Sequence, residues 1–450
     1  MYISKVDTLL ENLRKLLRRG AHRNVRNILQ RMHAADIAYL FRYLNEMEQL
    51  KIFRLLENSD MAPEIISHLD TPTGASILTQ MDRKRAAEIL QEMDPDDEVN
   101  ILQEVDPEVK EEILVHLSDT EAESIEEQFQ YPEDSAGRIM NTNCFTLHQE
   151  VTVSQAIEEL QGREEESTEM VFYVYVVDGN GRFVGVCSLR QLLMVPAQTR
   201  LQRIMTTEVV YVSPETDQEE VAKMVERYDL LAVPVIDDEK NILGIVTVDD
   251  VIDVIRHEAT EDIMKMVGTG DEYLNRSILR SARMRMPWLL AAFLGGFIGI
   301  QFLKMFDATL REIVSLAFFL PIIIAMGGNI GITSMTIVVR GLATGRISVR
   351  ELRRVIVKEL SVALLLGILY GVILMGLAYL QFGEVDYIGF VVGVSMLISM
   401  TMAAAIGTLA PIVLNTMKID PAVATGPFVT SAVDSLGILV YLSMATLILM

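Results

Sequence analysis

The chain has 450 residues and a formal net charge of −23, and half of its residues are apolar. Such acidity argues against a nucleic-acid partner, because binding phosphates needs clustered Lys and Arg. The charge is unevenly distributed: residues 1–286 carry 54 acidic and 30 basic side chains, whereas residues 287–450 carry 8 and 9. We therefore expect a multidomain protein with an acidic soluble half and a membrane half.

The first predicted domain, residues 1–130, contains a twelve-residue repeat. Isoleucines share one phase of it: Ile65, Ile77, Ile89, Ile101, Ile113 and Ile125. Residues that favour helix N-caps share another: Asp70, Asp82, Asp94, Asp106 and Ser118. Each unit predicts one short helix and a turn, and stacked units make an all-α, solenoid-like helical-repeat domain. The clustered Asp94, Asp96 and Asp97 are also candidates for a cation site, although capping alone explains Asp94.

A second repeat covers the next predicted domain, residues 131–256. RIMNT at 138–142 recurs as RIMTT at 203–207, and GRFVGVCSLRQLL at 181–193 recurs as NILGIVTVDDVI at 241–252. Each copy predicts a strand, a helix, a β-branched strand, a hairpin to another strand, and a helix. This duplicated α/β unit resembles a tandem pair of CBS domains.

The resemblance to CBS domains implies a nucleotide site. Such pairs hold adenine nucleotides between the copies, with the ribose on an Asp after the last strand. Asp250 matches that position in the second copy, whereas Gln191 stands at the equivalent place in the first. ATP is therefore an expected ligand of the pair, with one ribose position altered.

Residues 257–286 link the two halves and have the spacing of a charged helix. Glu258, Glu261 and Asp262 place three carboxylates within about one and a half turns. We expect a connecting, plug-like helix, and these carboxylates either form a solvated face or bind cations.

Five apolar stretches then predict membrane helices, at 288–305, 313–339, 360–380, 388–414 and 422–449. The loop after the second stretch is rich in basic residues: Arg340, Arg346, Arg350, Arg353, Arg354 and Lys358. The loop after the third contains Glu384 and Asp386 and no basic residue. By the positive-inside rule, the N-terminal half is cytoplasmic and the C-terminus external. We expect a multi-pass protein of the cell membrane, with residues 287–450 forming its membrane domain.

The second stretch contains helix-breaking residues well inside it: Pro321, Gly327, Gly328, Asn329 and Gly331. One interpretation is a broken helix whose freed carbonyls bind hard cations. The other is that the glycines allow neighbouring helices to approach closely.

The fifth stretch contains Asp434 as its one interior charge. An ionised carboxylate in lipid costs several kcal/mol, so it should face water or a partner. Thr430 and Gly426 precede it by one and two turns and share its face. Asp434 is either a protonated group bonded across helices or a carboxylate that passing cations use.

The order of these parts, with GGN in the second membrane stretch and GPFVTSAVD in the fifth, resembles the MgtE family of magnesium channels and transporters. The family implies a homodimer with a pore on its two-fold axis, lined by the second and fifth membrane helices. Residues at its pore would be Asp434, Gly426, Thr430, Gly327, Gly328 and Asn329. The family often has polar residues after Gly331, whereas Ile332 stands here.

The same resemblance implies regulation by cytosolic Mg²⁺, which closes the pore by bridging acidic residues. The matching positions are Asp97, Asp217, Glu219, Asp229, Asp250, Asp253, Glu258, Glu261, Asp262 and Asp420. Mg²⁺ prefers octahedral oxygen ligands, which these positions supply.

We therefore expect a channel or transporter that moves Mg²⁺ into the cytoplasm down its electrochemical gradient. No GxxxxGK[ST] motif is present, which argues against ATP-driven pumping, and we expect no enzymatic activity. Two alternatives stay open: a membrane-tethered sensor of adenylate or metal that transports nothing, and an ion-coupled carrier of divalent cations.

Overall fold

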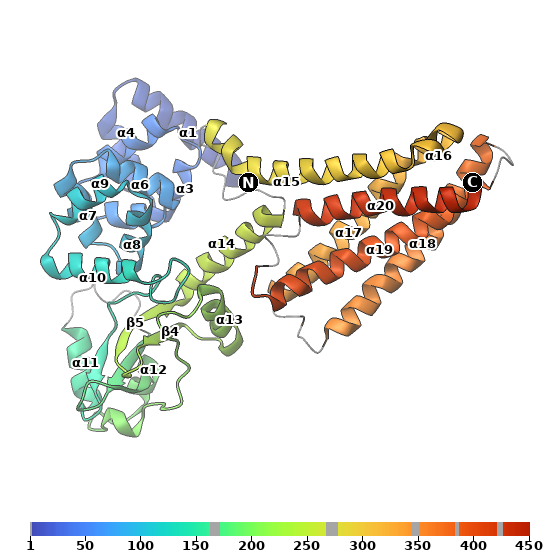
Figure 1. Cartoon of the computed structure of the whole chain (residues 1–450). Coiled ribbons are helices and arrows are strands. Elements are labelled where there is room, and N and C mark those ends of the chain that lie inside the picture. Colours follow the sequence, from blue (N-terminus) through green and yellow to red (C-terminus); the bar gives the residue numbers. More distant parts are fainter. Residues whose placement is uncertain are drawn as a thin grey trace. The chain divides into compact units, whose positions relative to one another are not determined.

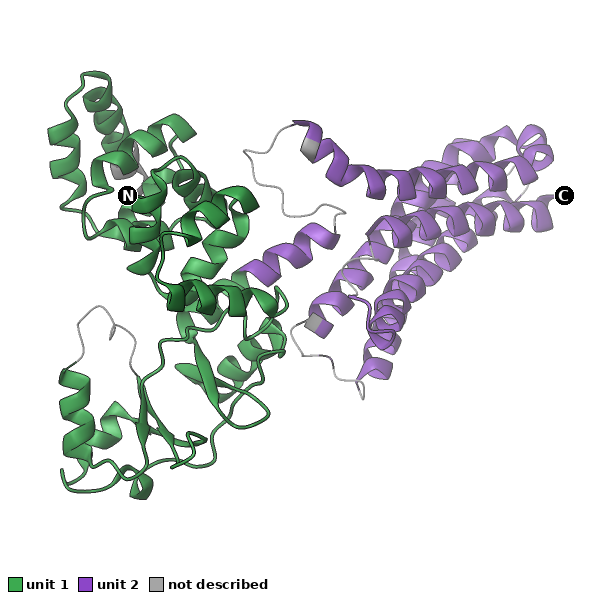
Figure 2. Ribbon diagram, turned by 60° about the vertical axis from the view of Figure 1, so that its left-hand side comes forward, with its two compact units in different colours: residues 1–256 green, residues 257–450 purple. Residues whose placement is uncertain are grey.

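The structure, a computed structural model, describes residues 2–162, 172–266, 278–343, 347, 351–382, 387–420 and 426–450. They form two compact units, Met1–Arg256 and His257–Met450 (Figure 2). Unit 1 contains the helical repeats and the CBS-like repeat, and unit 2 contains the long apolar helices (Figure 1).

Unit 1 begins with short helices, as the repeat predicts. They are α1 (Tyr2–Arg18), α2 (His22–Leu29), α3 (Ala34–Phe41), α4 (Glu46–Leu56), α5 (Ala62–Ser67), α6 (Thr71–Thr79), α7 (Arg83–Gln91), α8 (Pro95–Glu104), α9 (Pro107–Leu114) and α10 (Asp119–Gln130). The six repeated isoleucines are at most 4% exposed and lie in one hydrophobic core. The repeat therefore places one isoleucine per unit in the core.

The predicted N-caps are confirmed in position, since Asp70, Asp82, Asp94, Asp106 and Ser118 precede α6 to α10. The side chain of Asp94 nevertheless makes no capping hydrogen bond. It accepts one from Asn141 Nδ2 at 3.1 Å instead. Capping alone is therefore the wrong explanation for Asp94, which ties the helical repeat to the segment after it.

The rest of unit 1 is the duplicated α/β domain. The first copy contains β1 (Thr146–His148), α11 (Val153–Gln161), β2 (Tyr173–Val177), β3 (Phe183–Ser188) and α12 (Leu189–Met194). The second follows η2 (Leu201–Arg203) and contains α13 (Gln218–Tyr228), β4 (Ala232–Ile236), β5 (Ile242–Thr247) and the start of α14 (Val248–Met266). In the first copy β1 is parallel and β3 antiparallel to β2, and β4 and β5 pair antiparallel.

The first strand predicted for the second copy is reduced to a single parallel bridge between Val212 and Val235. In the first copy the N–H of Tyr175 donates to Phe145 O at 2.8 Å and extends the ladder. Pro234 occupies the position of Tyr175 in the second copy and has no N–H to donate. The missing hydrogen bond explains why no strand forms there.

Unit 2 begins at His257, within α14, and continues with the apolar helices. They are α15 (Ile278–Met305), α16 (Asp307–Glu312), η3 (Val314–Phe319), α17 (Leu320–Ala343), α18 (Leu352–Phe382), α19 (Ile388–Thr416) and α20 (Gly426–Leu449). α19 packs against α17, α18 and α20, and α15 packs against α20.

Five helical segments of the described residues are long and apolar enough to cross a membrane, which confirms the five predicted stretches. Large apolar side chains such as Leu289, Phe293 and Leu365 are exposed on them, as expected for contact with lipid. Several residues on which the predicted topology depends, Arg346, Arg350, Glu384 and Asp386, lie outside the described residues.

Candidate functional sites

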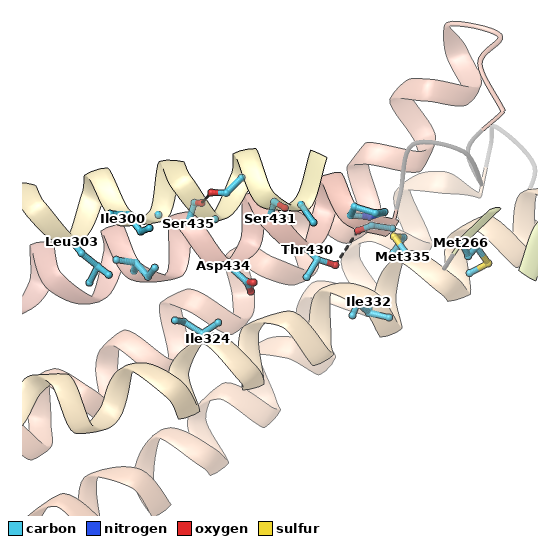
Figure 3. A pocket seen from close by; sticks show the side chains of 17 residues that line it. Met266, Ile300, Leu303, Ile324, Ile332, Met335, Thr430, Ser431, Asp434 and Ser435 are labelled. Carbon is cyan, nitrogen blue, oxygen red and sulfur yellow. Dashed lines mark hydrogen bonds between the residues drawn. The ribbon is translucent and has the colours of Figure 1, made fainter. Parts of the chain in front are cut away.

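Asp434, the predicted pore carboxylate, lines a cavity of about 600 Å³ within unit 2 (Figure 3). Residues of α15, α17 and α20 form the wall, together with Met266 at the end of α14. Thr430 and Gly426, which the helical spacing places on the face of Asp434, line the same cavity.

The wall of this cavity is chemically simple. Among the described residues that line it, Asp434 is the one charged side chain. Thr430 Oγ1 donates to Gly426 O of the same helix at 2.9 Å, and Ser435 Oγ donates to Gly295 O of α15 at 3.3 Å, so both hydroxyls have backbone partners. The described part of the wall therefore presents one carboxylate without a cationic side chain to neutralise it.

The interpretation of the second membrane helix as broken at its glycines is wrong. α17 is continuous from Leu320 to Ala343, and the irregular turn precedes it, because η3 ends two residues before Pro321. The glycines permit close packing instead: a Cβ at Gly407 of α19 would lie 2.3 Å from Gly331 O. Backbone carbonyls inside a continuous helix accept helical hydrogen bonds, so they are not freed as cation ligands.

The predicted GGN residues of α17 have different surroundings. A Cβ at Gly328 would lie 3.7 Å from Asp434 Oδ1, and one at Gly327 would lie 3.5 Å from Val433. Asn329 is exposed and does not line the cavity, and its backbone oxygen accepts from Thr333 Oγ1 at 2.7 Å. Ile332 also lines the cavity, at a position where the family that the sequence resembles often has a polar residue. The structure thus brings Gly328 to Asp434 but leaves the Asn329 side chain elsewhere.

Sequence reasoning did not single out a second buried carboxylate of unit 2, Glu359 of α18. It is 5% exposed and accepts a hydrogen bond from Ser334 Oγ of α17 at 3.0 Å. Its position just before the apolar stretch at 360 is the signal that could have found it. Glu359 has this polar partner and does not line the cavity, whereas no hydrogen bond from the described residues reaches the Asp434 side chain.

Unit 1 contains a crowded carboxylate cluster at the start of α8. Asp96 is 4% exposed, and its Oδ1 has no hydrogen-bond partner among the described residues. Its carboxyl group lies within hydrogen-bonding reach of Asp250, which also accepts from Thr247 Oγ1. Asp97 is the next residue along α8. The predicted residues Asp97 and Asp250 therefore lie near Asp96, which the sequence grouped with Asp94 and Asp97 as a candidate cation site.

The electrostatics of this cluster disfavour ionised carboxylates. Burial raises the pKa of Asp96 well above its usual value, and the charges of Asp250 and Asp97 add to the effect. Burial also raises the pKa of Asp97 to about 7 and that of Glu98 to about 8. A proton or a cation that binds to this cluster therefore stabilises it by reducing its negative charge. The orphaned Oδ1 of Asp96 and the nearby Asp250 carboxyl group are oxygens of the kind that a hard cation prefers.

Other predicted regulatory residues of unit 1 are dispersed. Asp217 caps α13 by accepting from the N–H of Glu219 at 2.8 Å, and the Glu219 side chain pairs with Lys223 at 2.8 Å. Asp229 ends α13 in the left-handed region with φ of 52°. Asp253 lies 3.6 Å from Arg256. Across the described residues, no group of three or more His, Cys, Asp or Glu side chains is placed to hold a metal ion.

Two of the predicted regulatory residues of unit 2, Glu261 and Asp420, meet at a lysine. Lys265 Nζ lies 2.9 Å from Glu261 Oε1 and 2.9 Å from Asp420 Oδ2. Glu258 and Asp262 lie on the same helix, α14. Burial lowers the pKa of Lys265, but the hydrogen bonds with Asp420 and Glu261 outweigh it and raise the pKa above its usual value.

A further cavity, of about 480 Å³, lies in the second CBS-like copy. Its lining combines aromatic rings with cations, including Tyr211, Tyr228, Lys223 and Arg227. Asp250, the predicted ribose ligand, is not among the lining residues. Gln191, at the equivalent position in the first copy, is occupied in capping α12: its Oε1 accepts from the N–H of Ser188 at 2.7 Å.

Comparison with known proteins agrees with this architecture. The chain matches the family model of the divalent cation transporter MgtE over residues 320–444, the MgtE intracellular N domain over 32–134, and the CBS domain over 136–197 and 201–257. A crystal structure of the cytosolic domain of the Mg²⁺ channel MgtE in complex with ATP is similar to it, with a TM-score of 0.51 and 36% identity, over 54% of this chain and 98% of that one.

Two relatives match over nearly their whole length. The magnesium transporter MgtE of Thermus thermophilus is 37% identical, with 98% of this chain and 99% of the relative covered. The magnesium transporter MgtE of Bacillus subtilis is 32% identical, with 98% and 97% covered. The fold, the five apolar helices and these full-length matches lead to one conclusion: the chain belongs to the MgtE family.

Proposed function

We propose that this protein is a magnesium channel whose ions pass Asp434 on their way into the cytoplasm, down the electrochemical gradient. The observation that carries the proposal is the single uncompensated carboxylate on the described wall of the α15–α17–α20 cavity. Mg²⁺ keeps most of its waters and binds through one or two carboxylates. Asp434 suits such a hydrated ion, and Thr430, Gly426 and Gly328 complete its surroundings. The two full-length relatives are named magnesium transporters, which supports this choice of ion.

The proposed assembly is a homodimer in the lipid bilayer with its pore on the two-fold axis. The four segments 1–130, 131–256, 257–286 and 287–450 would act as helical scaffold, CBS pair, connecting helix and pore domain. The basic residues Arg353, Arg354 and Lys358 at the start of α18 support a cytoplasmic N-terminal half and an external C-terminus.

Regulation is proposed to use the carboxylates of both units. Asp97 and Asp250, with Asp96, would hold a cytosolic Mg²⁺ in unit 1. The other predicted positions of unit 1, Asp217, Glu219, Asp229 and Asp253, would add ligands, and Glu258, Glu261, Asp262 and Asp420 would do so in unit 2. If only the closed conformation binds the ion, that conformation is stabilised by RT ln(1 + [L]/Kd) for each ion bound. Abundant Mg²⁺ would therefore favour closure.

ATP is proposed as a ligand of the CBS pair. The cavity with Tyr211, Tyr228, Lys223 and Arg227 offers rings for a base and cations for phosphates. The similar cytosolic-domain structure is that of a complex with ATP, which supports this ligand class.

The central test compares two membrane carboxylates in liposomes loaded with a Mg²⁺-sensitive dye. Asp434→Asn should reduce Mg²⁺ influx by about tenfold or more, because the ion loses its one charged ligand. Glu359→Gln is the matched control, since it removes a carboxylate that has its own partner, and its influx should stay near that of the parent. Unchanged influx in Asp434→Asn would reject the pore role.

The same assay separates the alternatives. A membrane-tethered sensor predicts no influx in the parent protein. An ion-coupled carrier predicts that influx requires a Na⁺ or proton gradient, whereas a channel conducts without one.

A further inference from the structure

The two faces of α18 differ in burial. Its buried residues recur three or four positions apart and therefore share one face: Glu359, Ala363, Gly367, Gly371, Leu374 and Ala378. This face packs against α19, and its glycines permit a close approach, since a Cβ at Gly371 would lie 2.7 Å from Gly393 O of α19. The opposite face of α18 is therefore turned away from α19.

That opposite face forms an exposed stripe with a basic end. The helical spacing places Arg354, Lys358, Leu365, Leu369, Val372 and Tyr379 on it, and we call these six residues the outer stripe. Its four apolar or aromatic members are each more than half exposed, and both basic residues are exposed. On a helix that spans a bilayer, such a stripe contacts acyl chains, and the basic side chains at its end reach the headgroups.

The basic end of the outer stripe has no acidic partner. Neither Arg354 nor Lys358 forms an ion pair with the described residues. Glu359 is the one acidic residue of α18, and it lies on the buried face, where it accepts a hydrogen bond from Ser334 Oγ at 3.0 Å. Glu351 is the nearest acidic residue before the helix and lies outside it. The two cations are therefore available to an anion from outside the chain.

The position of these cations on the helix also favours an anion. Arg353 and Arg354 lie in the first turn of α18, where the helix dipole disfavours positive side chains. Lys358 follows one turn after Arg354, so the two like charges share a face and repel each other. An anion placed between them offsets both unfavourable interactions.

We propose that the outer stripe binds an anionic phospholipid. The guanidinium of Arg354 and the ammonium of Lys358 would donate to the phosphate oxygens, and the acyl chains would lie along Leu365, Leu369 and Val372. A zwitterionic lipid carries its own ammonium beside the phosphate, which reduces its attraction to the two cations. The inference goes beyond the proposed function, because it requires insertion into a bilayer and no ion transport.

Quenching of a tryptophan on the outer stripe measures which lipid lies there. Leu365→Trp is introduced into the full chain together with Trp288→Phe, since Trp288 is the one tryptophan of the sequence. The protein is placed in phosphatidylcholine nanodiscs that contain a minor fraction of dibrominated phosphatidylglycerol or dibrominated phosphatidylcholine. One basic residue near an anionic lipid strengthens association about fivefold. We expect at least this preference for the brominated anionic lipid, and we expect it to fall as salt is added.

Three comparisons test whether the two cations cause the preference. Arg354→Gln with Lys358→Gln should abolish it. Arg283→Gln with Arg285→Gln removes two exposed cations from the start of α15 and is the matched control, which should retain it. The exchange Arg354→Lys with Lys358→Arg keeps both charges and should also retain it, which separates the loss of charge from a folding defect.

A tryptophan at the other end of α18 tests the position of the lipid. Leu380 is 81% exposed, and Leu380→Trp in place of Leu365→Trp should show no preference between the two brominated lipids. A preference of equal size at both positions would overturn the proposal, because a general enrichment of anionic lipid around the protein would then explain it.

Other outcomes also overturn the proposal. One is equal quenching of Leu365→Trp by both lipids, and another is loss of the preference in the Arg283 and Arg285 control. Weak quenching by both lipids would show that protein, such as a second copy of the chain, covers the stripe. Loss of the preference in excess glycerol phosphate would assign the cations to a soluble phosphate. Because quenching requires no ion flux, unchanged influx in Asp434→Asn would reject the channel and leave this test unaffected.

Discussion

Asp434 of unit 2 is the one charged side chain on the described wall of its cavity, whereas Asp96 of unit 1 lies among other carboxylates. The Asp434 wall is otherwise apolar or hydroxylic. Under the proposed function, the entering ion would balance the one negative charge there. Around Asp96, burial and the charges of Asp250 and Asp97 make full ionisation unfavourable, so that either a proton or a cation has to neutralise the group. Under the proposed function, a single carboxylate would attract a hydrated ion without trapping it, and a crowded group would retain one. The difference teaches how the number of carboxylates would separate the proposed path of the ion from its proposed sensor.

The largest effect is expected when the carboxylates around Asp96 are removed. Asp96→Asn with Asp250→Asn should remove one ion's share of the stabilisation of the purified protein by Mg²⁺, because that cation loses both carboxylates. At a Mg²⁺ concentration of 100 times Kd that stabilisation is about 2.7 kcal/mol per ion. Chemical denaturation with and without Mg²⁺ measures it.

The matched control for this pair is Glu108→Gln. Glu108 occupies the position of Asp96 in the next repeat unit and is exposed. It should retain the full Mg²⁺ stabilisation. Equal stabilisation of the double variant and the control would contradict a cation site at Asp96.

A smaller effect concerns pH. The pKa values of Asp97 and Glu98, about 7 and about 8, lie above the values near 4 expected in the unfolded chain. The folded state therefore binds more protons than the unfolded state between these pH values. The stability that these two groups contribute in EDTA is fully present below about pH 4 and is lost as the pH rises through about 7 to 8. Mg²⁺ should stabilise more at pH 8 than at pH 5, because it replaces those protons.

Denaturation midpoints in EDTA at pH 5, 6, 7 and 8 measure this loss. Asp97→Asn stays neutral at every pH and should flatten the profile. A stability that increases from pH 5 to pH 8 in EDTA would show that the cluster does not behave as described.

The smallest effect is expected at acidic residues that only cap helices, which contrast with the carboxylates around Asp96. Asp82 accepts hydrogen bonds from the N–H groups of Lys84 and Arg85, so Asp82→Ala should lower the free energy of unfolding by about 1 kcal/mol. Asp106 caps α9 in position but makes no such bond, and Asp106→Ala should cost less. Neither should alter the response to Mg²⁺, which thermal unfolding with and without the ion can verify.

Much of the architecture was predictable because it depends on short-range patterns. The twelve-residue spacing predicted which isoleucines are buried and which residues stand at the N-caps. Because the geometry of a helix is fixed, the spacing of residues determines which face they share. The five membrane stretches followed from apolar length alone. Asp434, Thr430 and Gly426 could be assigned to one face for the same reason.

Only the tertiary structure decided where those faces meet. The continuity of α17 could not be predicted, because glycines permit both a break and a close approach, and the choice depends on Gly407 of α19. The loss of one strand depends on the N–H that Pro234 cannot offer to a distant segment. Asp96 lies beside Asp250, which is more than 150 residues away in the sequence, and Lys265 lies beside Asp420 at a similar separation. Burial and charge pairing act through space, so sequence order alone does not reveal them.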